Sequence, residues 1–337
     1  MAEDFIGNNG GTRMKLPNFL ILGAAKGGTT SLYAYLSQHP QVFMSVPKEP
    51  TFFGNEGTDG LFNGLHDEDR AYHSRVITSF AEYSSLFRNV TGEQAIGEAS
   101  VYSLYLPSAP EQIRKYLPTA TMFAVLRNPA DRAYSAYLHV VRQARERLSF
   151  AEALEQEPFR IRQKWNPLWH FKAMGFYYEQ VKRYYDMFGR SQVHIYLYED
   201  FQKDPLGVIK EVLDILGVNS SFTPDMSKRY KKSYIPKHAA IERLLHKSKV
   251  KLQFAKQHWP KPLRWRVQYL EELIDRIAQP NRIAPPPIPD EVRASLLSEY
   301  QDNILRLSDL LRRDLSHWCN PVTVAAGHKR EAQASRV

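Results

Sequence analysis

The residue types best suited to chemistry follow an apolar run that begins at Phe19. That run gives way to Gly23-Ala24-Ala25-Lys26-Gly27-Gly28-Thr29-Thr30-Ser31, where a helical pattern starts. A strand, a glycine loop and a helix N-terminus in succession present backbone N–H groups and the positive end of a helix dipole to one phosphate or sulfate. A turn that only joins a strand to a helix is the alternative. Because charge and hydroxyls cluster there too, we expect an anion site made of Lys26, Gly27, Gly28, Thr29, Thr30 and Ser31.

The order of residues in this loop differs from that of a Walker A loop. A Walker A loop has four residues between its first glycine and Gly-Lys-Ser/Thr, whereas here Lys26 precedes the glycine pair. The arrangement of lysine followed by a hydroxyl, which holds Mg²⁺ in nucleotide kinases, is therefore missing. We expect no metal ligands in this chain, and a nucleotide kinase is disfavoured.

A second apolar run, from Thr121 to Leu126, also ends at a charged residue and a helix start. Asn128 is suited to the N-cap position and Pro129 to the first helical position. Arg127 then lies at the carboxyl end of a strand, where open α/β sheets bind ligands. Ser135, two turns into the helix, could approach the same anion. A structural ion pair is the alternative for Arg127, but two anion sites on neighbouring strands favour a bisphosphorylated nucleotide.

Strand and helix patterns alternate along most of the chain. Strands are predicted over 18–23, 95–97, 121–127 and 193–198, and helices over 29–38, 108–116, 129–147, 171–188, 205–216 and 290–314, with a capping box at Ser149. This alternation predicts an α/β protein with a P-loop-like fold of three layers, in which helices flank a central, mostly parallel sheet. One domain over 17–319 is expected, with disordered tails over 1–16 and 320–337.

Composition limits the possible classes of protein. The 337 residues are 43% hydrophobic, which suits a large core, and the single cysteine, Cys319, cannot form an internal disulfide. Residues 1–18 lack the apolar run of a signal peptide, and no run reaches the about 20 residues of a membrane span. These features predict a cytoplasmic protein without a transmembrane segment.

The net charge of +9 is concentrated in one segment, residues 228–261, which contains eleven Lys or Arg residues and one acid, Glu242. Such a segment suits a solvated helical face, nucleic acid, an anionic membrane or a phosphorylated small molecule. A nucleic-acid or membrane-surface binder without turnover is therefore an alternative function, although the segment has no recognised nucleic-acid motif and no specific nucleic-acid partner is expected.

Taken together, these residues resemble the sulfotransferases that use 3′-phosphoadenosine 5′-phosphosulfate (PAPS), in particular the glycan sulfotransferases and their soluble bacterial relatives. The resemblance covers about residues 18–318. It implies that Lys26 to Ser31 form the 5′-phosphosulfate loop, that Arg127 and Ser135 bind the 3′-phosphate, and that adenosine 3′,5′-bisphosphate (PAP) is the product. Tyr198-Glu199-Asp200 and the Leu-Ser-His-Trp sequence ending at Trp318 are also similar to family features.

The resemblance also suggests the catalytic residues. Lys48-Glu49-Pro50-Thr51-Phe52-Phe53 is similar to the stretch that carries the general base of the glycan branch, which implies that Glu49 takes a proton from the acceptor while Lys26 stabilises the leaving phosphate. A surface carboxylate is the alternative for Glu49. His39 and His139 are further candidates, because small-molecule sulfotransferases generally use histidine, and Lys48 could steer sulfate or acceptor.

The basic segment falls where the family has a lid over the nucleotide. Lys231 and Lys232 are the expected lid contacts, and the residues from Lys237 onward could instead guide an anionic acceptor. One departure is Ala99, where the glycan branch often has lysine, so glycan specificity does not transfer directly. We expect a small metabolite or carbohydrate as acceptor, with a hydroxyl preferred over an amine. Its identity and the oligomeric state are not determined by the sequence. The loops 52–75 and 142–175, with Trp165, Trp169 and Tyr177, could line its pocket, although core packing is the commoner role of such residues.

Overall fold

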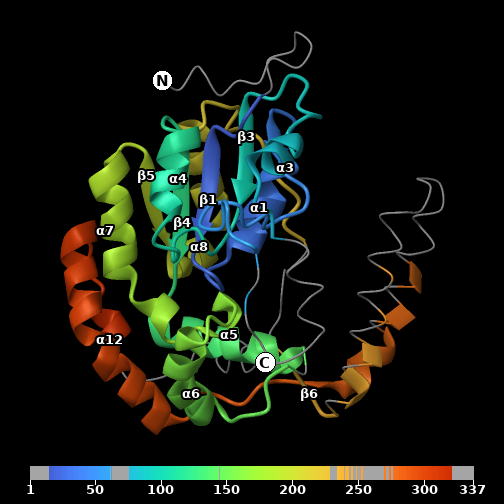
Figure 1. The fold of residues 1–337 in the computed structure, drawn as a ribbon, viewed down its shortest axis with the longest axis vertical. Helices are drawn as coiled ribbons and strands as arrows, with labels where there is room; N and C mark the ends of the chain where they lie inside the picture. The colour runs from blue at the N-terminus through green and yellow to red at the C-terminus, as the bar shows by residue number, and fades with distance from the viewer. Residues whose placement is uncertain are drawn as a thin grey trace, which may run out of the picture.

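A computed structural model describes residues 15–60, 62, 76–143, 145–227, 234–238 and 276–320, together with scattered positions between 240 and 274. Helices cover both faces of one central sheet (Figure 1), so the predicted three-layer α/β fold is confirmed. Lys231 and Lys232 lie outside the described residues, as do most residues of the two predicted tails. Those predictions remain predictions.

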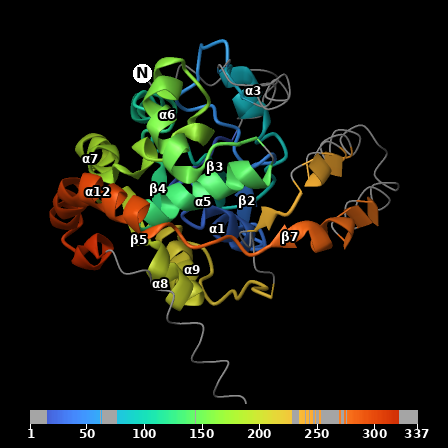
Figure 2. The same cartoon turned by 90° about the horizontal axis from the view of Figure 1, so that it is seen from below.

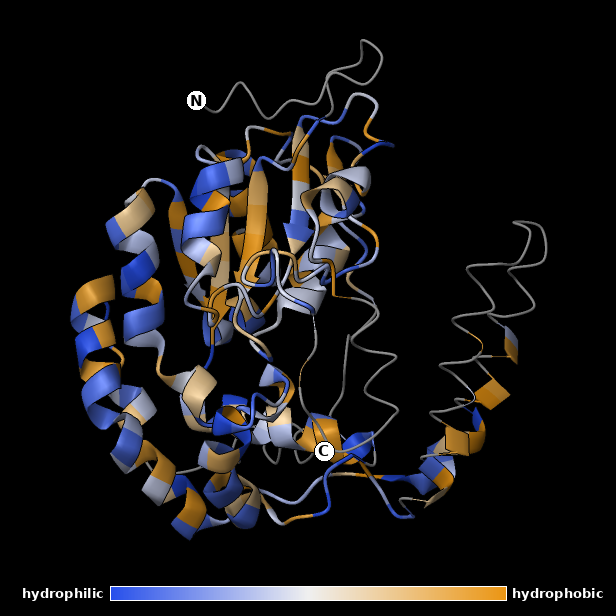
Figure 3. Ribbon diagram, in the orientation of Figure 1, coloured by the Kyte–Doolittle hydropathy of each residue, from blue (hydrophilic) through white to orange (hydrophobic). Residues whose placement is uncertain are grey.

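The central sheet has five parallel strands in the order β2-β3-β1-β4-β5. The strands are β1 (Phe19–Gly23), β2 (Val42–Met44), β3 (Ala95–Ala99), β4 (Thr121–Leu126) and β5 (Val193–Leu197). Most of their residues are hydrophobic (Figure 3), as expected for a parallel sheet buried on both faces. Because all five strands run in one direction, their carboxyl ends share one edge of the sheet.

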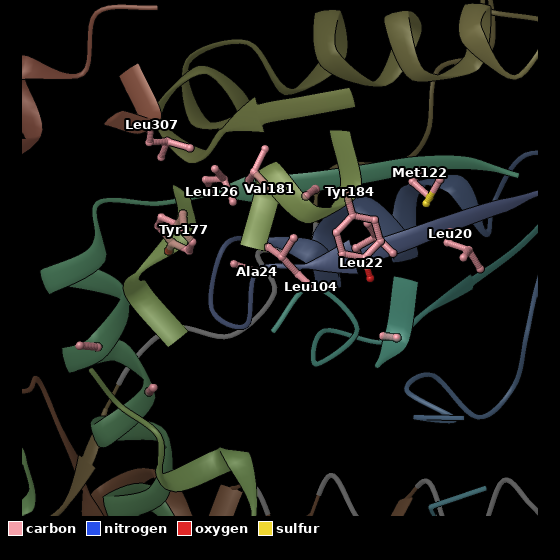
Figure 4. Packing of buried hydrophobic residues seen from close by; sticks show 14 of the residues in the cluster. Leu20, Leu22, Ala24, Leu104, Met122, Leu126, Tyr177, Val181, Tyr184 and Leu307 are labelled. Atoms are coloured by element: carbon pink, nitrogen blue, oxygen red, sulfur yellow. The ribbon is translucent and has the colours of Figure 1, made fainter. Parts of the chain in front are cut away.

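Two hydrophobic clusters occupy the two faces of the sheet, and β1 contributes alternate residues to each. Phe19 and Ile21 pack with helices α1 (Thr29–Leu36) and α9 (Pro205–Ile215). Leu20 and Leu22 pack with α4 (Ala109–Tyr116) and α7 (Tyr177–Phe188), and Figure 4 shows both leucines with Val181 and Tyr184 of α7. The alternation of a strand therefore fixes which helices cover which face.

The remaining helices surround this core. They are α3 (Phe80–Ser85), α5 (Pro129–Arg142), α6 (Phe150–Arg162), α8 (Tyr198–Lys203) and α12 (Asp290–Leu311), with short 3₁₀ turns at Pro167–Trp169, Ala173–Gly175, Gln279–Asn281 and Ser316–Cys319. A small antiparallel pair joins β6 (Ile235–Pro236) to β7 (Arg282–Ile283). Figure 2 shows α12 alongside α7. The predicted capping box at Ser149 is confirmed, since both of its hydrogen bonds are present at the start of α6.

The structure differs from the sequence prediction in a few elements. Strand β2 and helix α3 were not predicted, because three and six residues are too few to establish a period. The helix predicted over 129–147 ends at Arg142. The helix predicted over 171–188 begins at Tyr177, because Ala173–Gly175 form a separate 3₁₀ turn and Phe176, with φ of −79° and ψ of 79°, is not helical. The backbone N–H groups of Lys172 and Ala173 donate to the carboxylate of Glu157, at 2.6 and 2.7 Å.

Within the part of the chain that the structure describes, no helix combines the length and the apolar character needed to cross a lipid bilayer.

The loop between β1 and α1 packs closely against the end of β4. The Ala24 N–H donates to the Val125 carbonyl at 3.0 Å, and the Gly27 N–H donates to the Ala24 carbonyl at 2.9 Å. A Cβ atom added to Gly27 would lie 2.1 Å from the Val125 carbonyl oxygen, which is too close for any side chain. Glycine at this position therefore lets the loop contact the neighbouring strand directly.

We expect Gly27→Ala to lower the free energy of unfolding by about 1–3 kcal/mol, because the added methyl group forces the loop away from the backbone of Val125. Thermal or denaturant unfolding measures the change. Gly92→Ala is the matched control, since a Cβ atom there meets nothing within 4 Å. Equal stability of the two variants would contradict the close packing of this loop.

Candidate active site

The loop after β1 prepares the N-terminus of α1 for an anion. Gly28 is the N-cap of the helix, with φ of 100°, and as a glycine it has no side chain to accept from the first amides. The first turn contains no acidic residue. The first bonds back to the Gly28 carbonyl come from the amides of Ser31 and Leu32, so the preceding amides lie ahead of the helical hydrogen-bond ladder. Lys26 lies in the same loop with φ of 70°. The predicted grouping of Lys26 with the helix N-terminus is present.

Arg127 and this loop both approach the ring of Tyr198. The guanidinium carbon of Arg127 is 4.9 Å from the ring centroid of Tyr198, at the start of α8. A Cβ atom built on Gly28 would be 3.1 Å from Cδ2 of the same ring. The loop and Arg127 therefore approach the same tyrosine ring, which agrees with their position after the neighbouring strands β1 and β4.

Several hydrogen bonds fix the backbone around Arg127. The Tyr177 hydroxyl donates to the Arg127 carbonyl at 3.0 Å, and burial raises the pKa of that hydroxyl to about 12. Asn128 caps α5 by accepting from the amides of Ala130 and Asp131, as predicted, and its amide group donates to the Trp318 carbonyl at 3.1 Å. The backbone next to Arg127 is thereby hydrogen-bonded to the 3₁₀ turn Ser316–Cys319, called here the C-terminal turn.

The Tyr198-Glu199-Asp200 segment anchors the same C-terminal turn. The Glu199 carboxylate accepts from the indole N–H of Trp318 at 2.8 Å, and His317 lies 2.9 Å from it. Asp200 pairs with Arg313. Sequence reasoning assigned no role to Tyr198 or Glu199, and the family resemblance was the one signal that drew attention to them.

Glu49 lies at the same edge of the sheet, in the loop after β2. Its backbone N–H donates to the carbonyl of Ala99 at the end of β3, at 2.9 Å, and Ala99 pairs with Ile21 of β1. The Lys48 ammonium contacts the Glu49 carboxylate at 2.5 Å, and these side chains are 17% and 30% exposed. Glu49 is therefore a partly exposed carboxylate with a cation beside it, one strand away from the Lys26 loop.

Two aromatic side chains hold the far end of the Glu49 loop. Phe52 and Phe53 are almost completely buried. The ring of Phe52 stacks on Tyr83 of α3 at 4.6 Å between centroids, and Phe53 meets Tyr83 edge-on at 5.1 Å. The spacing of the Lys-Glu-Pro-Thr-Phe-Phe motif thus has a structural basis, because the phenylalanines anchor the loop that carries Glu49.

The two histidines considered as bases have other surroundings. His39 is 3% exposed, its Nδ1 atom accepts from the Gln41 amide at 3.0 Å, and its Nε2 atom lies 2.9 Å from the Asn219 carbonyl. Both nitrogens are thus engaged in the structure. His139 lies on α5 with Nδ1 3.0 Å from an Arg142 nitrogen, and its role as a base remains a prediction.

The other predicted positions are distributed as follows. Ser135 is 8% exposed on α5, two turns beyond Arg127, and its contact with a shared anion remains a prediction. Trp169 and Tyr177 are buried in the main core, where packing is their evident role. Ala99, the position at which the family resemblance leads one to expect lysine, is fully buried in the cluster that packs α1 and α9 against the sheet.

Comparison with known proteins identifies the family. The model of the sulfotransferase domain matches residues 16–251. A crystal structure of a sulfotransferase from Alicyclobacillus acidocaldarius is 35% identical, with a TM-score of 0.68, and the match covers 91% of this chain and 100% of that one.

Relatives from eukaryotes are named sulfotransferases as well. The bifunctional heparan sulfate N-deacetylase/N-sulfotransferase 4 of Mus musculus is 26% identical over 308 residues, which are 88% of this chain and 30% of the mouse protein. The membrane-associated sulfotransferase kil1 of Dictyostelium discoideum is 21% identical, covering 62% of this chain and 58% of that protein. This chain thus spans less than a third of the mouse relative. It belongs to the sulfotransferase family, whose sulfuryl donor is PAPS.

Proposed function

We propose that this protein transfers a sulfuryl group from PAPS to a hydroxyl of a small metabolite or carbohydrate. The observation that carries the proposal is that the loop containing Lys26 and the guanidinium of Arg127 both approach the ring of Tyr198. A lysine-containing loop and an arginine that approach the same ring suit the two phosphate groups of one adenosine bisphosphate, and a helix N-terminus beside a lysine suits the reacting end.

The residues of this edge can divide the chemistry of transfer between them. PAPS supplies the sulfuryl group, and the bond between its sulfur and the 5′-phosphate oxygen breaks as the acceptor oxygen attacks from the opposite side. Glu49 accepts the proton of the acceptor hydroxyl. Lys26 and the first amides of α1 stabilise the negative charge left on the 5′-phosphate, and Arg127 with Ser135 holds the 3′-phosphate.

The position of Lys26 before the glycine pair supports transfer without a metal ion, because the lysine can neutralise the leaving phosphate directly. An amine is the second candidate acceptor, since curated relatives are named N-sulfotransferases. A cytoplasmic location and a lid formed by Lys231 and Lys232 remain part of the proposal. Transfer of label from radiolabelled PAPS to the components of a cell extract tests the proposed activity, and mass spectrometry of the labelled product identifies the acceptor.

Glu49→Gln should lower kcat by about 10²–10⁴-fold while changing the Kd for PAP by less than about threefold, because the amide keeps the shape of the side chain but cannot accept the proton. Steady-state transfer and calorimetric titration with PAP measure the two quantities. Glu155→Gln, at an exposed position on α6, is the matched control. Equal losses in turnover and PAP affinity would argue against a base at Glu49.

Treatment with EDTA followed by gel filtration should leave the transfer rate within about twofold of the untreated enzyme, because Lys26 and the α1 amides provide the charge stabilisation that Mg²⁺ provides in Walker A enzymes. Rates before and after treatment, with and without added MgCl₂, provide the measurement. A rate that is lost on chelation and restored by Mg²⁺ would refute the metal-free mechanism.

A further inference from the structure

A buried carboxyl group lies beneath the Glu49 loop and has no part in the proposed chemistry. Glu98 belongs to β3, is 1% exposed, and shares a sheet face with its register partner Leu20, which packs in the main core. A buried carboxyl group in an apolar core is costly unless it is hydrogen-bonded or neutral. Its presence there therefore requires an explanation.

The partners of Glu98 lead directly to the Glu49 loop. The Ser100 hydroxyl donates to Glu98 Oε2 at 2.8 Å, and the same hydroxyl oxygen accepts from the Thr51 backbone N–H at 3.0 Å. Ser100 and Thr51 are themselves 1% and 4% exposed. Since the serine hydroxyl can donate only one proton, the acceptor at Glu98 orients it so that its lone pair faces Thr51.

The backbone held in this way has an unfavourable conformation. Glu49 and Thr51 both have positive φ, 64° and 54°, a region that residues other than glycine rarely adopt. Such conformations persist only where the surroundings enforce them. The backbone hydrogen bonds on this short turn include Glu49 N–H to the Ala99 carbonyl, Thr51 N–H to the Ser100 hydroxyl, Ile77 N–H to the Pro50 carbonyl, and the Asn55 side-chain amide to the Thr51 carbonyl.

We propose that Glu98 is a positioning residue for Glu49, which it serves by orienting the Ser100 hydroxyl that holds the backbone turn over residues 49–51. The inference rests on the proposed role of Glu49 as the base and extends it to a group that does not contact substrate. A base must lie within hydrogen-bond reach of the proton it takes, so a turn that loosens here lowers turnover.

The surroundings of Glu98 raise its pKa, so its protonation state changes near neutral pH. Burial raises its pKa to about 7, the bond from Ser100 and the charge of Lys48 oppose this rise, and the charge of Glu49 adds to it. The other titratable groups that interact with Glu98 are Tyr83 of α3 and Tyr184 of α7, whose own pKa values are raised far enough that they stay neutral. Glu98 is therefore protonated in the folded enzyme below about pH 7.

Ionisation of Glu98 should make the folded enzyme less stable as the pH rises. Its ordinary pKa of 4.5 rises to about 7 on folding, so the folded state binds the proton more tightly than the unfolded state. Wild type should therefore lose stability relative to Glu98→Gln as the pH rises from about 4.5 through about 7. The glutamine variant keeps a carbonyl acceptor for Ser100 and has no proton to lose.

The test combines hydrogen exchange with kinetics. Ser100→Ala should speed exchange of the Thr51 amide by about tenfold or more, since its acceptor is removed, and lower kcat by about tenfold with the Kd for PAP within about twofold. Ser103→Ala is the matched control, because the buried Ser103 hydroxyl has no hydrogen-bond partner in the structure. Glu98→Leu should behave like Ser100→Ala. Glu98→Gln should keep the turnover and the slow Thr51 amide exchange of the wild type. It should also lack the loss of stability that the wild type shows between about pH 4.5 and about 7.

The outcomes separate this inference from the proposed function. Faster exchange and lower kcat in both Ser100→Ala and Glu98→Leu, with neither effect in Ser103→Ala or Glu98→Gln, support the positioning role. Exchange and kcat equal to those of Ser103→Ala would overturn it, and so would faster exchange with unchanged kcat. A failure of Glu49 as the base would instead be seen in Glu49→Gln, whatever Ser100→Ala does to exchange.

Discussion

The close contact of Gly27 with the Val125 carbonyl is the constraint on which the rest of the site depends. It brings the loop after β1 against the end of β4, with no side chain between them. Arg127 lies two residues after Val125, so the same contact places the backbone of Arg127 beside the loop. Tyr198, which directly follows the neighbouring strand β5, is approached by both Gly28 of the loop and the Arg127 guanidinium.

A parallel sheet turns this contact into a site, because the chain leaves every strand at the same edge. The anion loop follows β1, Arg127 follows β4, Tyr198 follows β5, and the amide of Glu49 is bonded to the end of β3. Each of these groups is held by a different kind of interaction. Backbone contacts hold the loop, the Trp318 turn and Tyr177 hold the Arg127 backbone, and aromatic stacking on Tyr83 holds the Glu49 loop.

The fold and part of the site could be predicted from the sequence because their signals are local. Apolar runs followed by Lys-Gly-Gly or Arg-Asn-Pro mark strand ends, and caps such as Ser149 and Asn128 act within three residues of their own position. Contacts between distant segments carry no such signal. The bonds of Asn128 to Trp318 and of Thr51 to Ser100, and the contacts of Tyr198 with Gly28 and Arg127, arise only when the strands are ordered in the sheet.

Calorimetric titration of wild type, Lys26→Ala and Arg127→Ala with two nucleotides tests the central claim most directly. PAP carries both phosphate groups, whereas adenosine 5′-phosphate lacks the 3′-phosphate. The account predicts that Lys26→Ala weakens binding of both nucleotides, and that Arg127→Ala weakens PAP by about tenfold or more but leaves adenosine 5′-phosphate unchanged. Equal effects of Arg127→Ala on the two nucleotides, or no effect on either, would contradict the binding of one nucleotide between the two positions.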